Sequence, residues 1–160
     1  MKDLFTSEQV NVQQGLDLVQ LQLGSSKIRM YYQTVFKICS SMQGASKLAM
    51  ATEGVRPEKW GELAKYDSRD VDTPCHHEYR RSFKTTNLTH WKVAFEGPLV
   101  VMTFDELTAK FHYADAAKLC VWLRRAAKQA KNWSGDRSRI WNTYARLTNA
   151  AENDKTVFVN

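Results

Sequence analysis

Hydrophobic positions in the first part of the chain recur at the spacing of amphipathic helices. Ser7 can cap a first helix that Gly24 ends, and Ser25 can cap a second that Gly54 ends, with an interruption at Gly44. The helical spacing of the first rests on Val10, Gln14, Leu18 and Leu21. That of the second rests on Ile28, Tyr31, Tyr32, Val35, Cys39, Met42, Ala45, Ala49 and Met50. Two long N-terminal helices are therefore expected.

Two shorter helices are predicted next, because each segment begins with proline in a first helical turn. They cover Pro57 to Lys65 and Pro74 to about Phe83, the latter with Thr73 as its N-cap. The polar stretch from Tyr66 to Thr73 between them is loop-like but too short for an interdomain linker. We therefore expect one domain over 1–160, with a helical part over about 7–83.

From Trp91 the pattern changes to alternation, which is typical of strands. Residues 91–96 and 99–104 predict a hairpin, because Gly97-Pro98 lies between them as a turn. A third strand follows over 107–113, so that a three-stranded antiparallel meander covers about 91–113.

Helical spacing returns after the meander. A long helix is predicted over about 115–133, with Asp115 at its start and Ser134-Gly135 at its end. A final helix follows over about 136–151. The fold class predicted is α+β, with the meander and these helices forming a second part over about 90–151. The pattern indicates no internal repeat.

The charge distribution along the chain indicates a function as well as a fold. Between Lys118 and Arg146, eight of nine charged residues are basic, whereas residues 1–80 carry ten basic and ten acidic side chains. The net charge of +6 therefore arises from the second half of the chain. A localised positive field of this kind predicts an anionic partner.

The basic residues of the helix over 115–133 gather on one side of it. At about 100° per residue, an apolar face of Ala, Leu and Trp packs on the sheet, and the opposite arc carries the cations. That arc comprises Lys118, Arg124, Arg125, Lys128 and Lys131. A solvated helix commonly mixes in acids at i, i+4 spacing, because like charges at that spacing repel. The absence of acids is the informative feature.

This face predicts binding to nucleic acid through its phosphate backbone. Arg137 and Arg139 extend this row of cations, which we call the stripe. Trp122 or Trp133 at its border could stack on bases. Other interpretations are an ordinary solvated surface, a docking face for an acidic protein and, less favoured, a membrane-surface helix. The pattern does not choose between DNA and RNA, nor does it indicate an oligomeric state.

The order of a short helix, three strands and a long helix from Pro74 to Trp133 is similar to the αβββα order of the double-stranded RNA-binding domain. The likeness is topological, since Tyr113-Ala114-Asp115 stands where that family begins its last helix with a lysine pair. No site residues are carried over from it.

A second resemblance rests on short motifs in the second half of the chain. They are Trp91-Lys92-Val93, Phe95-Glu96-Gly97, Val100-Val101-Met102-Thr103-Phe104, Trp133 and Gly135-Asp136. These motifs look like those of small accessory proteins encoded by bacteriophages and mobile elements. The resemblance implies an alternative function, an inhibitor or accessory protein that docks its basic face on an acidic host protein.

One cluster, Cys75-His76-His77-Glu78, carries chemically active side chains. With Asp72, and His90 or His112 brought close by folding, it could offer zinc ligands. Successive helical residues point about 100° apart, so Cys75, His76 and His77 cannot all face one ion. We interpret the cluster as a polar helix start and expect neither metal nor cofactor. No GxGxxG, Walker A or GxSxG motif is present, and we expect a binding protein rather than an enzyme.

Cysteine usage and the N-terminus predict the compartment. Cys39, Cys75 and Cys120 are widely spaced without a CxxC pair, which favours a reducing cytoplasm. The residues from Lys2 to Glu8 contain no apolar stretch of signal-peptide length. The apolar run Leu119 to Leu123 is far shorter than the roughly 20 residues that span a bilayer. A soluble cytoplasmic protein is expected.

Overall fold

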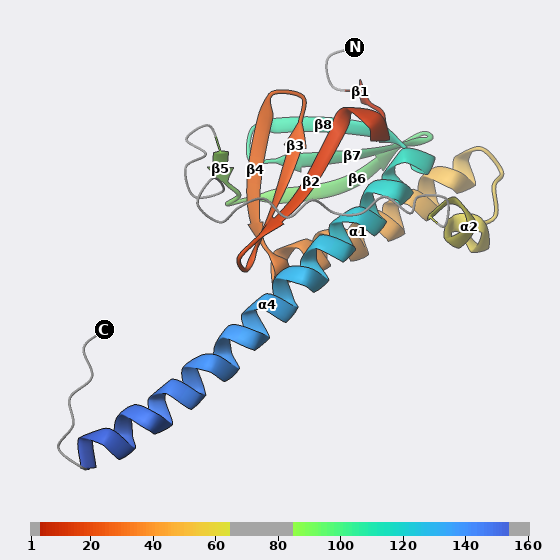
Figure 1. Ribbon diagram of the computed structural model, residues 1–160. Coiled ribbons are helices and arrows are strands. Elements are labelled where there is room, and N and C mark those ends of the chain that lie inside the picture. The colour runs from red at the N-terminus through yellow and green to blue at the C-terminus, as the bar shows by residue number, and fades with distance from the viewer. Residues whose placement is uncertain (1–3, 65–84, 154–160) are drawn as a thin grey trace.

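The computed structural model describes residues 4–64 and 85–153; within 85–87 and 136–153 it describes the backbone alone. The fold is α+β, as predicted, with two four-stranded sheets alongside two long helices (Figure 1). The strands are β1 (Leu4–Phe5), β2 (Val10–Gly15), β3 (Leu18–Leu23), β4 (Ser26–Tyr31), β5 (Thr85–Asn87), β6 (Trp91–Glu96), β7 (Leu99–Phe104) and β8 (Leu107–His112). The helices are α1 (Tyr32–Thr52), α2 (Trp60–Ala64) and α4 (Tyr113–Asn153), with 3₁₀ turns η1 (Ser7–Gln9) and η2 (Pro57–Lys59).

Each sheet is an antiparallel meander to which the other half of the chain adds one parallel strand. β2, β3 and β4 form the first meander, and β5 lies parallel to β4 with Thr85 opposite Lys27. β6, β7 and β8 form the second, and β1 lies parallel to β8 with Leu4 opposite Lys110. Neither four-stranded sheet is complete without a strand from the other half.

The two halves of the chain are an internal structural repeat. Each contains a short strand, a meander and a long helix, and the second copy of each meander strand and helix begins 81 residues after the first. The expectation of no internal repeat is therefore wrong, because the repeat is kept in the elements and only sparsely in the sequence. Identical pairs between 10–52 and 91–133 are Val12/Val93, Leu18/Leu99, Val19/Val100, Tyr32/Tyr113, Lys37/Lys118, Cys39/Cys120, Ala45/Ala126, Lys47/Lys128 and Ala49/Ala130.

The first predicted helix is wrong, because β2 and β3 occupy most of the segment between Ser7 and Gly24. A tight turn separates the strands, with Leu16 at a φ of 58°, a conformation that leucine rarely adopts and that the sequence does not signal. The buried side of the two strands follows alternation on either side of that turn. It comprises Val10, Val12, Gln14, Val19, Leu21 and Leu23, and Gln20 between them is also buried.

The second predicted helix begins later than expected. Ser26–Tyr31 forms β4, because pairing with β3 overrides the helical spacing of its apolar residues. The helix α1 then starts at Tyr32 and passes through Gly44 without a break. Its predicted end is confirmed, since Gly54 follows it with a φ of 73°, a conformation for which glycine is suited.

The remaining predictions divide by segment. The short helix over Pro57–Lys65 is confirmed as η2 and α2, and the meander over 91–113 is confirmed as β6, β7 and β8. The loop over 66–73 and the helix from Pro74 lie outside the described residues. A wholly helical part over 7–83 is excluded by β2, β3 and β4.

The helix predicted over 115–133 and the one predicted over 136–151 are a single helix, α4. It passes through Ser134 and Gly135, because glycine inside a helix costs only about 1 kcal/mol relative to alanine. A Cβ atom added at Gly135 would meet no other group within 4 Å. The C-terminal part of α4 extends away from the sheets (Figure 1).

The core is shared by the two repeats. α1 packs against β6 and β7 of the second repeat, whereas α4 packs against β2 and β3 of the first. The two helices also pack against each other, where Cys39 and Cys120 are both fully buried. Buried residues of both halves therefore form one hydrophobic cluster.

Candidate functional site

The buried side of α4 matches the apolar face expected of the basic helix. It contacts α1 as well as the sheet, an arrangement that the sequence did not indicate. The buried residues on it are Ala116, Ala117, Leu119, Cys120, Trp122, Leu123, Ala126, Ala127 and Ala130. The cationic side chains therefore belong to a helix whose first half is packed against α1 and the sheet.

The structure places the predicted cations of α4 in different surroundings. Lys128 and Lys131 are exposed, whereas Lys118 and Arg125 are half-buried. The positions of Arg137 and Arg139 belong to the same helix, in the part whose backbone alone is described. The exposed and half-buried cations follow the outer side of α4, away from the core.

Arg124 is held within the protein. Its Nη2 donates a hydrogen bond to Oε1 of Gln43 on α1 at 2.8 Å. Its guanidinium also lies over the ring of Trp60 on α2, 5.9 Å from the ring centroid. Both contacts join α4 to neighbouring helices. Arg124 therefore stabilises the helix layer, which we define as the pair α1 and α4, and its contact with α2.

The two tryptophans proposed at the border of the stripe differ in exposure. Trp122 is 2% exposed and belongs to the hydrophobic cluster, so its ring offers no open face for stacking. Trp133 is half-buried. Within the residues with described side chains, Trp122 is therefore a core residue.

Sequence reasoning missed a second helix of the same character. No acidic residue occurs in α1, which carries Lys37 and Lys47 at the repeat positions of Lys118 and Lys128. A signal was present, because the pattern KxCx5AxKxA occurs at 37–49 and again at 118–130. The spacing of 81 residues between the two occurrences was sufficient to reveal the repeat.

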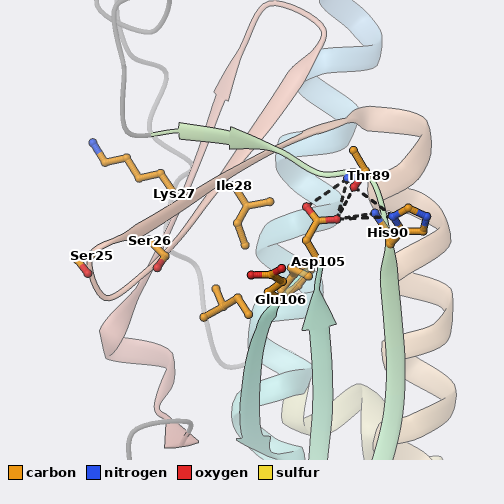
Figure 2. Close-up of a pocket in the computed structure, with 10 residues that line it drawn as sticks. Ser25, Ser26, Lys27, Ile28, Thr89, His90, Asp105 and Glu106 are labelled. Atoms are coloured by element: carbon orange, nitrogen blue, oxygen red, sulfur yellow. Dashed lines mark hydrogen bonds and ion pairs between the residues drawn. The ribbon is translucent and has the colours of Figure 1, made fainter.

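A pocket of about 740 Å³ lies between the turns that join β3 to β4 and β7 to β8 (Figure 2). Its walls bring together Lys27 from one sheet and Glu106 from the other, with Ser25 and Ser26 at the first turn. Ile28, Phe104 and Leu107 add apolar surface.

Asp105 organises one wall of this pocket. Its Oδ1 accepts hydrogen bonds from the Thr89 hydroxyl at 2.5 Å and from the His90 backbone N–H at 2.8 Å. These donors, the Thr89 hydroxyl first, stabilise the carboxylate and lower the pKa of Asp105 below its usual range. The carboxylate is thus committed to holding the segment before β6 against the β7–β8 turn (Figure 2).

The predicted cluster Cys75-His76-His77-Glu78 lies outside the described residues, as does Asp72. Of the two other histidines, His90 has its Nδ1 3.9 Å from Oδ1 of Asp105. His112, on a different part of the surface, has its Nε2 3.9 Å from Oε1 of Glu53. Among the described residues, no group of three or more His, Cys, Asp or Glu side chains is placed to hold a metal ion.

Of the helices in the described part of the chain, none is both long and apolar enough to cross a membrane. Comparisons of the chain with protein-family models, with curated proteins and with solved structures find no match.

Proposed function

We propose that the protein binds nucleic acid through the cationic side of α4, by contacts to the phosphate backbone. The observation that carries this proposal is the uninterrupted course of α4 through 116–135, a stretch that contains cations and no acid. Lys128 and Lys131 are exposed there, and Lys118 on the same helix is half-buried. Lysines on a rigid helix can follow a row of phosphates and release their counterions.

Salt dependence tests the proposal directly. Four or five neutralised phosphates give a log–log slope of affinity against salt of about −4 on duplex or single-stranded probes. Fluorescence anisotropy at several salt concentrations measures this slope. A slope near zero, or no binding to any probe at low salt, overturns the proposal.

A matched pair of substitutions separates a local contact from a general effect of charge. Lys128→Glu on α4 and Lys92→Glu on β6 both reverse an exposed lysine, so they change the net charge equally. We expect Lys128→Glu to lower affinity about tenfold and Lys92→Glu to have little effect, with the circular dichroism spectrum unchanged in both. Equal losses in the two variants contradict a site on α4.

The alternative function, an inhibitor that docks on an acidic protein, uses the same cations. Nuclease treatment before purification distinguishes the two functions. Loss of all co-purifying material, with the purified protein then binding added nucleic acid, supports the proposal. A stoichiometric protein partner that survives the nuclease, together with no affinity for nucleic acid, supports the alternative.

A further inference from the structure

The internal repeat gives the helix layer an approximate two-fold symmetry. Cys39 and Cys120 are equivalent residues, and each thiol lies within hydrogen-bonding distance of the other's backbone carbonyl. Equivalent residues that contact each other lie on the axis that relates two copies. The axis therefore passes between α1 and α4 at these two cysteines.

The lysines of α1 and α4 lie outside the buried faces of the two helices. In α1 the buried residues contact α4 and the second sheet, and in α4 they contact α1 and the first sheet. Both sheets lie on one side of the helix pair (Figure 1). α2 packs against α4 at Arg124, whose guanidinium lies over the Trp60 ring. Of the four lysines outside the buried faces, Lys37 and Lys128 are exposed. Lys47 and Lys118 are half-buried.

These four lysines are two identical pairs related by the repeat. Lys37 corresponds to Lys118, and Lys47 corresponds to Lys128. The helix segments that hold them, 32–52 and 116–135, contain no acidic residue. The helix layer therefore presents equivalent cations on either side of one axis.

We infer that the ligand of this surface is a nucleic-acid duplex, bound by α1 and α4 together. The inference rests on the proposed function and adds α1 to the binding surface. The two antiparallel strands of a duplex are related by local two-fold axes, whereas a single strand has one direction and no such axis. Packed helices lie about 8–10 Å apart, on the scale of the roughly 12 Å major groove. Each lysine pair can thus contact the phosphates of one strand.

Two double variants test the contribution of each helix. Lys37→Glu with Lys47→Glu changes α1, and Lys118→Glu with Lys128→Glu changes α4. We expect both to lower the affinity for a short duplex by similar factors, about tenfold or more. Lys27→Glu with Lys92→Glu, on β4 and β6, applies the same change of charge away from the helix layer and should have a much smaller effect. Glutamine variants repeat the comparison where a glutamate variant does not fold.

The same duplex and its two separated strands complete the test, with DNA and RNA versions of each. Binding of the duplex about tenfold or more tighter than either strand supports the inference, and the DNA and RNA versions identify which duplex is bound. Equal or tighter binding of single strands overturns it. An α1 variant that behaves like the strand control while the α4 variant loses affinity also overturns it and leaves the proposed function intact. No binding to any probe removes the proposed function itself.

Discussion

Cys39 and Cys120 contact each other reciprocally at the centre of the helix pair. The Cys39 thiol donates to the Cys120 carbonyl with an Sγ to oxygen distance of 3.6 Å, and the Cys120 thiol donates to the Cys39 carbonyl at 3.4 Å. The two residues are 81 positions apart, the same separation as that between the repeats. Their small side chains allow α1 and α4 to approach closely at this point.

We expect both thiols to resist alkylation in the folded protein. Both side chains are fully buried, so iodoacetamide cannot reach either sulfur in the native protein. For Cys39, the hydrogen bond with Cys120, followed by burial, also raises the pKa and disfavours the reactive thiolate. Iodoacetamide labelling at mildly alkaline pH, read by mass spectrometry, should modify neither residue until denaturant is added. A Cys75→Ser background keeps the third cysteine from obscuring the result. Rapid labelling of Cys39 in the native protein contradicts this packing.

Substitution of Arg124 is expected to reduce stability. Arg124→Ala removes the hydrogen bond to Gln43 and the contact with the Trp60 ring. Together these changes should cost about 1–2 kcal/mol of unfolding free energy. Urea denaturation followed by circular dichroism measures the change, and Lys128→Ala on the exposed side serves as the control with little effect. Comparable stability of the two variants would show that Arg124 is not part of the helix layer.

Asp105 makes stability depend on acidic pH. Its pKa is lowered in the folded state from the ordinary value of 3.8, so its contribution is complete above that value. The contribution is lost as the pH falls from about 3.8 through the lower folded pKa. Asp105→Asn should melt at a lower temperature than the wild type at neutral pH, and this difference should shrink in acid. A difference that stays constant with pH contradicts the role of the carboxylate.

At the equivalent turns of the two repeats, adding a glycine and removing one should change the stability of the protein in opposite directions. Leu16 and Gly97 have φ values of 58° and 56°, but only glycine takes this conformation without strain. Leu16→Gly should therefore stabilise the protein by about 1 kcal/mol, and Gly97→Ala should destabilise it by a similar amount. A Cβ at Gly97 would meet nothing within 4 Å, so the backbone alone is tested. Thermal melts of both variants that shift in the same direction contradict this view.

Much of the second repeat could be predicted from local sequence. The alternation over 91–96 and 99–104 around Gly97-Pro98 defined a hairpin, and each strand lies where the pattern indicated. The first meander was missed because Val10, Gln14, Leu18 and Leu21 satisfy a helical period, whereas only the apolar buried residues of each strand alternate. Leu16-Asp17 stands where the second repeat has Gly97-Pro98, and the neighbouring Gly15 is the last residue of β2.

The cationic residues of the candidate site could also be identified locally, because charge and helical spacing are properties of neighbouring residues. The surroundings of these residues could not be identified from neighbouring residues. The inward position of Arg124 depends on Gln43 and Trp60, which reach it from other helices. The part that Lys37 takes in the inferred surface depends on the packing of α1 against α4.

The sequence by itself determined the α+β class, the second meander and the acid-free helix segments, because these follow from period, turn residues and charge within short windows. Only the tertiary structure decided that the chain is a repeat whose halves exchange their first strands. The pairing of β1 with β8 and of β5 with β4 joins residues far apart in the chain. Such pairing gains its stability from burial and hydrogen bonds that exist only once both halves have folded together.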